Sequence, residues 1–491
     1  MKHLRWYDHF GINVFWLGLN IRNNAFGSIF LPYLVAQFVG PEIRNTALGE
    51  MRTAGLVIAM LVQPAMGFLS DRSTSRWGRR RPFIFVGALL DVVFLAAVAL
   101  ATNFWFLLVV VVLIQFSSNI SHGPLQALIP DLVPEEQRGV ASAVKAIFEL
   151  LPLILLGITV APLVGAGHFG WAVVVTAAGV LAAMALTVAL VKETPLKEKP
   201  DIPLGPTMVR VLGMLGGIVG GAVAGVAAGA MVGGVAGLAA WPAGGQNLAL
   251  TVGVAVGGTV SMIVAVVAGV WAGAAATVGP EVRQHASFVW WVVNRLLFLA
   301  AITSFQAFAA YFLMYAFHID IKPATSMTGT LVTVVGVFTL VSAFPSGWLS
   351  DRLGQKSLVA ISGVVAAVGA FLVLGTIGLP ILALLYVAGG LLGLATGLFM
   401  TTNWALGTRL VPPAEAGRYL GISNLAGAGA GMIGTGLGGP IADFLNLRVP
   451  GLGYFVLFAG YGLLFLLSTA SLKWVVDTKA AKPQRPGASA A

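Results

Sequence analysis

Long apolar segments alternate with short polar ones along almost the entire chain. Each apolar segment holds about 20 residues or more, which is the length that an α-helix needs to cross the hydrocarbon core of a bilayer. We place these segments at residues 10–38, 51–70, 82–101, 104–129, 140–164, 169–191, 208–240, 248–276, 288–317, 324–349, 357–377, 380–408, 419–442 and 452–476. The pattern therefore predicts an all-α, multi-pass membrane protein with about fourteen transmembrane helices.

The predicted helices divide into two bundles of six with an insertion between them. Residues 1–191 form the first bundle, 288–476 the second, and 192–287 the insertion. The insertion begins with a charged linker that contains proline and continues as a segment rich in Gly, Ala and Val. Residues 477–491, rich in Lys, Pro and Ala, have the composition of a disordered tail, and we expect that tail on the cytoplasmic side.

The glycines of the insertion recur at every fourth position from Gly217 to Gly237, and Trp241-Pro242 interrupts the apolar pattern after them. Small residues at this spacing let two helices approach closely in a bilayer. We therefore expect an inserted helical hairpin at the flank of the bundle. A structural role is the first interpretation, and a regulatory or oligomerising role is the alternative.

Charge is scarce and unevenly distributed. The chain is 58% apolar and 9% charged, whereas a soluble domain carries about 25% charged residues. Four of the 28 Lys and Arg lie at predicted outer ends and three at membrane depth, so 21 fall in segments that are cytoplasmic if both termini are cytoplasmic. This asymmetry is what the positive-inside rule expects. The net charge of +10 is thus a topology signal, and we expect no nucleic-acid partner.

Several other classes are disfavoured. The chain has no cysteine and six scattered histidines, and it shows neither metal-ligand spacing nor a nucleophile–base set, so we expect no enzyme and no cofactor. Residues Met1–Tyr7 lack the apolar core and cleavage site of a signal peptide, so we expect the first span to be retained. We expect an integral membrane protein, monomeric in the bilayer, and in the inner membrane if the source is bacterial.

A polar loop motif occurs once in each half. Gly67 and Asp71-Arg72 precede Arg79-Arg80, and Gly347 and Asp351-Arg352 repeat the pattern. This repeated loop resembles that of the major facilitator superfamily of secondary transporters. The resemblance implies a cytoplasmic gate, for which we name Asp71, Arg72, Arg79, Arg80, Asp351 and Arg352.

Ionisable groups at membrane depth are costly and mark functional sites. The first span contains Asn20, Arg22, Asn23 and Asn24 near its midpoint. We expect Arg22 to line a cavity, and the alternative is a buried arginine paired with an acid on a neighbouring helix.

The acids at membrane depth are few. Asp91 and Glu149 lie well inside predicted spans, whereas every acid of the second half lies in or beside a loop. We therefore expect any proton-carrying carboxylate in the first half, with Glu149 favoured over Asp91. The alternative for Glu149 is a static ion pair with Lys145 or Arg22, since Lys145 lies one helical turn away.

In the family that the chain resembles, the first, fourth, seventh and tenth helices line a central cavity. Amides bond hydroxyls and aromatic rings stack on sugar faces, so their combination suits a sugar. Other neutral polar ligands would use the same groups, and amides also pack helices together. The candidate solute-binding residues are Asn20, Arg22, Asn23, Asn24, Asn119, His122, Gln126, Gln306, Asn403 and Trp404.

A closer resemblance begins at Gln63-Pro64, continues through Gly78–Ile84 and includes Gly123-Pro124. These segments are similar to the plant sucrose/proton symporters and to the wider glycoside–pentoside–hexuronide cation symporters. The resemblance implies cation-coupled uptake of a glycoside. Gln63 stands where sodium-coupled members carry an acid, and Gln115 and Gln126 stand where the sucrose symporters carry their coupling Asp and an Arg.

The sequence thus favours a transporter of a sugar or similar small polar solute by alternating access, with a proton as the second partner. A uniporter, a proton-coupled exporter of amphipathic compounds and a non-transporting receptor or scaffold remain alternatives.

Overall fold

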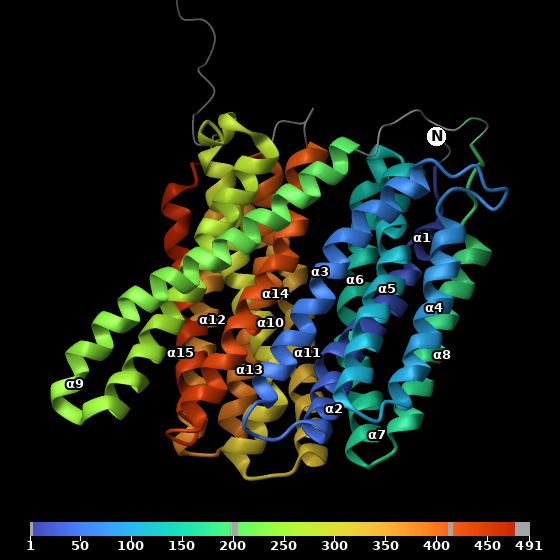
Figure 1. Cartoon of the computed structure of the whole chain (residues 1–491). Helices are drawn as coiled ribbons and strands as arrows, with labels where there is room; N and C mark the ends of the chain where they lie inside the picture. The colour runs from blue at the N-terminus through green and yellow to red at the C-terminus, as the bar shows by residue number, and fades with distance from the viewer. Residues whose placement is uncertain (1–2, 197, 199–204, 411–415, 477–491) are drawn as a thin grey trace, which may run out of the picture.

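The computed structural model describes residues 3–196, 198, 205–410 and 416–476, and every regular element in these residues is a helix (Figure 1). The predicted tail 477–491 lies outside the described residues. Eleven helical segments of the described part are long and apolar enough to cross a membrane, with the long helix of the insertion counted once. The prediction of an all-α protein with membrane-crossing helices is confirmed.

The first half consists of six rods. Its elements are α1 (Trp6–Asn24), the π-helical turn η1 (Ala25–Phe30), α2 (Leu31–Phe38), α3 (Arg44–Asp71), α4 (Arg81–Ala99), α5 (Phe104–Leu132), the 3₁₀ turn η2 (Glu135–Gln137), α6 (Arg138–Leu155), the π-helical turn η3 (Leu156–Val160), α7 (Ala161–Gly165) and α8 (Phe169–Leu190). Helical backbone angles continue through both π turns, so α1–η1–α2 and α6–η3–α7 are each one continuous rod. The side chain of Asn103 caps α5 by accepting a hydrogen bond from the backbone N–H of Phe106 at 2.9 Å.

The insertion and the second half follow. Their elements are α9 (Gly205–Val278), the 3₁₀ turn η4 (Pro280–Arg283), α10 (Ala286–Phe317), α11 (Ile321–Leu353), α12 (Gln355–Gly378), α13 (Leu382–Arg409), α14 (Ala416–Asn446), α15 (Leu452–Ser471) and the 3₁₀ turn η6 (Leu472–Trp474). Apart from 51–70, which begins seven residues after the start of α3, the predicted spans begin and end within about five residues of these bounds. Thus 104–129 corresponds to Phe104–Leu132 and 169–191 to Phe169–Leu190.

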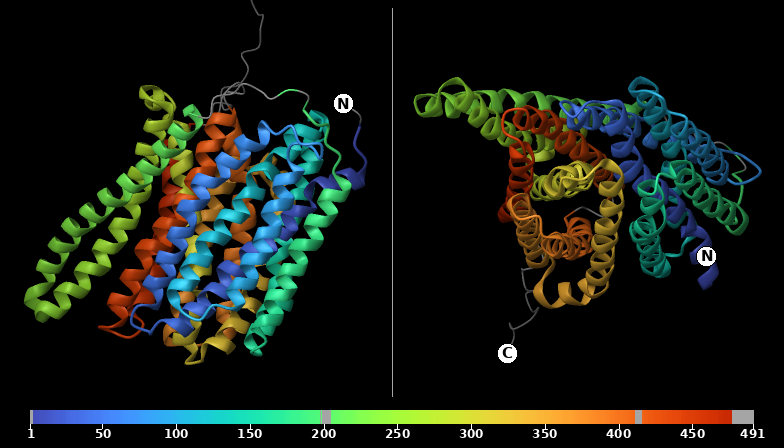
Figure 2. Two further views of the ribbon diagram at one scale, coloured as in Figure 1. Left: turned by 45° about the vertical axis from the view of Figure 1, so that its right-hand side comes forward. Right: turned by 90° about the horizontal axis from the view of Figure 1, so that it is seen from below.

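The helix α9 is folded back on itself. Its backbone leaves the helical conformation at Gly244 and Gly245, where φ of Gly245 is +62°. The two arms then run antiparallel with their glycines in contact, so that a Cβ at Gly221 would overlap the backbone of Gly269. Figures 1 and 2 show the pair of arms tilted along the outside of the second half.

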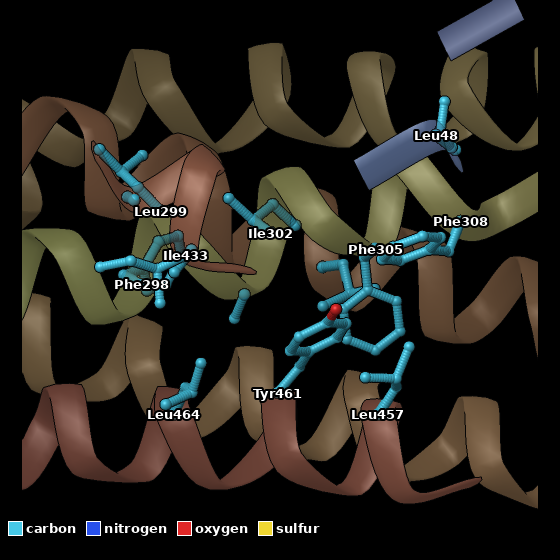
Figure 3. Close-up of a cluster of buried hydrophobic side chains, with 14 of the residues drawn as sticks. Leu48, Phe298, Leu299, Ile302, Phe305, Phe308, Ile433, Leu457, Tyr461 and Leu464 are labelled. Carbon is cyan, nitrogen blue, oxygen red and sulfur yellow. The ribbon is translucent and has the colours of Figure 1, made fainter. Parts of the chain in front are cut away.

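The core of the second half is aromatic and is built around α10. Phe298 stacks on Phe399 with ring centroids 3.7 Å apart, and Phe305 stacks on Phe458 at 4.5 Å. Figure 3 shows the side chains of this cluster, including Phe305 and Tyr461, pointing toward one another from different helices. Because lipid tails are as apolar as these rings, close van der Waals packing and not exclusion of water stabilises the bundle.

The molecule has two ends along the helix axes. We call the end that carries the 72–80 loop the motif face, and the end that carries the 39–43 and 447–451 loops the opposite face. The two halves lie side by side when the molecule is viewed from the opposite face (Figure 2). Near that face they touch, since the Tyr311 hydroxyl of α10 donates to the carbonyl of Pro32 in α2 at 2.9 Å.

Candidate functional site

The motif of the first half forms a network of ion pairs on the motif face. Arg80 is 2% exposed, and its guanidinium donates to Asp131 at 2.9 Å and pairs with Asp71. Arg79 pairs with the same Asp131 at 2.5 Å. Asp71, Arg79 and Arg80, three of the predicted gate residues, therefore meet around the acid that ends α5.

Glu193 completes this network, although no sequence pattern predicts its participation. Its carboxylate accepts hydrogen bonds from the backbone N–H groups of Arg80 (3.0 Å) and Arg81 (2.9 Å), at the N-terminus of α4. Donors at a helix N-terminus favour a negative charge. Burial nevertheless raises the pKa of Glu193 above its usual range, because the loss of hydration outweighs these two bonds. The segment that carries Glu193 follows α8, so only the folded chain brings it to α4.

The second copy of the motif makes different contacts. The guanidinium of Arg352 lies 4.0 Å from the centre of the Trp348 ring, and Asp351 is exposed. Within the described residues, neither side chain forms an ion pair. Arg72 of the first copy likewise lies over an aromatic ring, that of Phe68, at 5.4 Å.

A buried ion pair joins α1 to α4. The Arg22 Nε lies 3.3 Å from a carboxylate oxygen of Asp91, and both side chains are 1% exposed. The Ser117 hydroxyl of α5 donates to the other carboxylate oxygen at 2.5 Å. The structure thus places Arg22 inside the first half against an acid of a neighbouring helix, which is the alternative that the sequence left open.

A second polar cluster joins α1, α5 and α6, and we call it the α1–α5–α6 cluster. Lys145 lies 4.1 Å above the Trp16 ring and 3.4 Å from the carboxylate of Glu149. His122 meets the edge of Trp16 at 5.4 Å, and the Gln126 amide lies 3.2 Å from the His122 ring nitrogen. Unlike the pair of Arg22 and Asp91, this ion pair is partly exposed, with 30% of the Lys145 side chain and 36% of the Glu149 side chain exposed.

The predicted asparagines of the first half lie close to their own helices. Asn20 donates to the Trp16 carbonyl at 2.9 Å, Asn24 to the Asn20 carbonyl at 2.8 Å and Asn119 to the Gln115 carbonyl at 2.7 Å. Asn23 is exposed. In each bonded amide one N–H is committed to the backbone, and the amide oxygen remains able to accept a bond from a hydroxyl.

The predicted residues of the second half lie in two places. Asn403 is fully buried, donates to Asn294 at 2.7 Å and accepts from Arg295 at 3.3 Å. The Arg295 guanidinium also lies 5.2 Å from the Trp404 ring. Gln306 contributes the polar group to an otherwise apolar cavity of about 50 Å³ between α10, α11, α12, α13 and α15. The predicted solute-binding residues are therefore distributed over separate clusters.

Comparison with known sequences places this chain in a family. A family profile described as Major Facilitator Superfamily matches residues 14–289 and 296–490. Sucrose transport protein SUT1 of Oryza sativa subsp. japonica is 30% identical over 139 residues, which cover 24% of this chain and 25% of that protein. Sucrose transport protein SUC3 of Arabidopsis thaliana is 31% identical over 157 residues, which cover 26% of this chain and 25% of that protein. The matched segments thus span about a quarter of each relative.

Comparison with solved structures agrees on the fold. The nucleoside transporter NupG superposes with a TM-score of 0.62 at 12% identity, over 95% of this chain and 99% of NupG. A POT peptide transporter superposes with a TM-score of 0.64 at 16% identity, over 96% of this chain and 95% of that chain. The predicted resemblance is confirmed: the chain belongs to the Major Facilitator Superfamily, a family of secondary transporters and not of enzymes, and it is distantly similar to plant sucrose transporters.

Proposed function

We propose that this transporter moves a sugar, a glycoside or a similar small polar solute by alternating access, coupled to a proton. The observation that carries the proposal is the α1–α5–α6 cluster, where an aromatic ring, an amide, an imidazole and an accessible ion pair converge. In this cluster an aromatic ring that can stack on a sugar lies beside polar groups that can bond the hydroxyls of that sugar. The similarity to sucrose transport proteins supports the same class of solute.

The accessibility of the two candidate acids favours Glu149 as the proton carrier. A coupling carboxylate must exchange its proton with water during the cycle. Glu149 is 36% exposed and has Lys145 as its ion-pair partner, whereas Asp91 is 1% exposed between Arg22 and Ser117. In this scheme Asp91 holds Arg22 in place, and Glu149 takes up and releases the proton.

The orientation and the number of crossings belong to the same proposal. The motif face is cytoplasmic, both termini are on that side, and both arms of α9 cross the bilayer, which gives fourteen crossings. Exposed apolar side chains on both arms support contact with lipid, and they include Val223, Met231 and Leu238 on the first arm and Leu250 and Val256 on the second. The six-helix halves 1–191 and 288–476 then rock about a solute bound between them, with the insertion 192–287 at their flank.

The test is solute-induced proton movement in liposomes that contain the purified protein, with a panel of mono- and disaccharides. We expect one sugar to alkalinise the outside. Glu149→Gln should abolish that signal and leave exchange of the same sugar intact. Glu136→Gln is the matched control, because Glu136 is an exposed loop acid on the motif face and should behave as the parent. Sugar flux without protons would indicate a uniporter, and no flux across the panel would refute the sugar class.

A further inference from the structure

An acid of the second half binds the first half at the opposite face. Asp443 lies near the end of α14, and each of its carboxylate oxygens accepts two hydrogen bonds from the start of α3. One oxygen accepts from the Asn45 side-chain amide at 2.6 Å and from its backbone N–H at 3.3 Å. The other accepts from the Thr46 backbone N–H at 2.7 Å and from its hydroxyl at 2.8 Å.

These bonds are sheltered from solvent. Asp443 is 5% exposed and Asn45 is 1% exposed. Three further ionisable groups face this region: Arg44 on α3, Tyr311 on α10 and Tyr454 on α15. Arg44 lies 5.6 Å from the centre of the Tyr311 ring, and no cation of the described residues lies within 4 Å of the Asp443 carboxylate. The negative charge is therefore compensated by N–H and O–H donors and not by an ion pair.

The contact continues along both helices. A Cβ at Gly439 of α14 would overlap the carbonyl of Asn45, and a Cβ at Gly49 of α3 would overlap the carbonyl of Thr435. One turn further, Thr53 of α3 faces Gly436. The two halves are thus packed backbone to backbone along α3 and α14, and the Asp443 bonds lie at the end of this seam nearest the opposite face.

Protonation of Asp443 weakens this arrangement, because hydrogen bonds to a charged carboxylate are stronger than those to a neutral acid. A carboxylate only accepts, whereas a protonated carboxyl must also donate one bond. A proton on the oxygen that faces Asn45 can be donated only if the Asn45 amide turns its buried, unbonded oxygen toward Asp443, and that turn removes the bond that the amide now donates. A proton on the other oxygen can be donated to the Thr46 hydroxyl, which then no longer donates to Asp443. In either case one of the four bonds that Asp443 accepts is lost, and the remaining bonds lose their assistance by charge.

We propose that Asp443 is a proton-operated latch that keeps the opposite face closed while it is ionised and lets α3 separate from α14 when a proton binds. The proposal rests on alternating access in the proposed function. It adds a titrating group in the second half, where the sequence led us to expect none. With the motif face cytoplasmic, acid on the outside would favour opening toward the outside.

The experiment uses the natural absence of cysteine from the chain. Thr53→Cys places a reporter about 12 Å below Asn45 along α3, two helical turns into the seam. A membrane-impermeant maleimide is added outside proteoliposomes between pH 5 and pH 8, and the rate at which it labels this cysteine is measured. This rate is divided by the labelling rate of Thr102→Cys, which is exposed in the loop before α5. The ratio removes the intrinsic pH dependence of thiol reactivity.

We expect the ratio for Thr53→Cys to rise several-fold from pH 8 to pH 5. Adding Asp443→Asn should give the high ratio at every pH, because a neutral amide cannot accept all four bonds. Adding Asp320→Asn should reproduce the parent, since Asp320 is an exposed acid on the same face. Thr46→Val removes a single donor and serves as a milder second variant in case Asp443→Asn does not fold. Adding Thr46→Val should raise the ratio at pH 8 and keep its pH dependence.

Two results would overturn the proposal. If neither Asp443→Asn nor Thr46→Val raises the ratio at pH 8, Asp443 does not hold the seam closed. If Asp443→Asn raises the ratio but keeps the pH dependence of the parent, another group titrates. Labelling needs no solute, so these results are independent of whether any sugar is transported.

Discussion

The two copies of the loop motif have similar sequences but different surroundings. In the first half, Arg80 is buried and connects Asp71 to Asp131, and Glu193 joins from beyond α8. In the second half, Arg352 lies over the ring of its own helix neighbour Trp348. A repeated motif therefore does not guarantee repeated contacts.

The length of the loop explains the difference. In the first half, nine residues separate α3 from α4 and include Arg79 and Arg80. In the second half, Gly354 alone separates α11 from α12, and it turns the chain with φ of +82°. A single residue leaves no room for a cation pair. The following Lys356 instead donates to the carbonyl of Val475 at 2.7 Å.

The largest effect should follow from Arg80→Ala. The substitution removes the cation that Asp71 and Asp131 share and leaves Asp131 paired with Arg79 alone, and breaking a buried ion pair costs about 3–5 kcal/mol. Because Asp71 is 44% exposed, solvent compensates part of this loss, and we expect about 3 kcal/mol. The measurement is the free energy of unfolding of the purified protein in detergent. Arg76→Ala, at an exposed cation of the same loop, is the control, and equal losses in both variants would show that the network contributes nothing.

A smaller, pH-dependent effect should follow from Glu193→Gln. The pKa of Glu193 is raised by burial from 4.5, so the folded protein favours the protonated acid. That contribution to stability is fully present below pH 4.5 and is lost as the pH rises through the raised pKa in the folded state. The free energy of unfolding should therefore fall with pH across this interval in the parent and fall less in the variant. Identical pH profiles would contradict this assignment.

The smallest effect should follow from Arg352→Ala. An exposed cation–π contact contributes about 0.5–1 kcal/mol, and Trp348 is 57% exposed. We expect the free energy of unfolding in detergent to change by less than about 1 kcal/mol. A loss as large as that of Arg80→Ala would mean that the second loop has partners that this conformation does not show.

The sequence was sufficient for the fold because spacing and apolar length are local properties. The spans, the loop motif and the family resemblance all follow from short stretches, such as Gly67 to Arg80. For Arg22, the sequence offers a buried pair with an acid of a neighbouring helix only as an alternative, and it does not identify that acid as Asp91, because the partner lies on another helix. The sequence identifies Asp443 only as an acid beside a loop, because its hydrogen-bond donors lie 397 and 398 residues away along the chain. Contacts between halves depend on conformation, which no local pattern encodes.

The two π turns have a consequence for the way these helices can evolve. A π turn accommodates one more residue than an α turn, so each side chain beyond it points about 100° away from where an uninterrupted α-helix would put it. In η1 this offset lies between Arg22, which faces α4, and Pro32, which receives the hydroxyl of Tyr311. Deleting one residue from Ala25–Phe30 would restore regular hydrogen bonding and rotate Pro32 away from its partner. This rod therefore tolerates substitutions far better than changes in length.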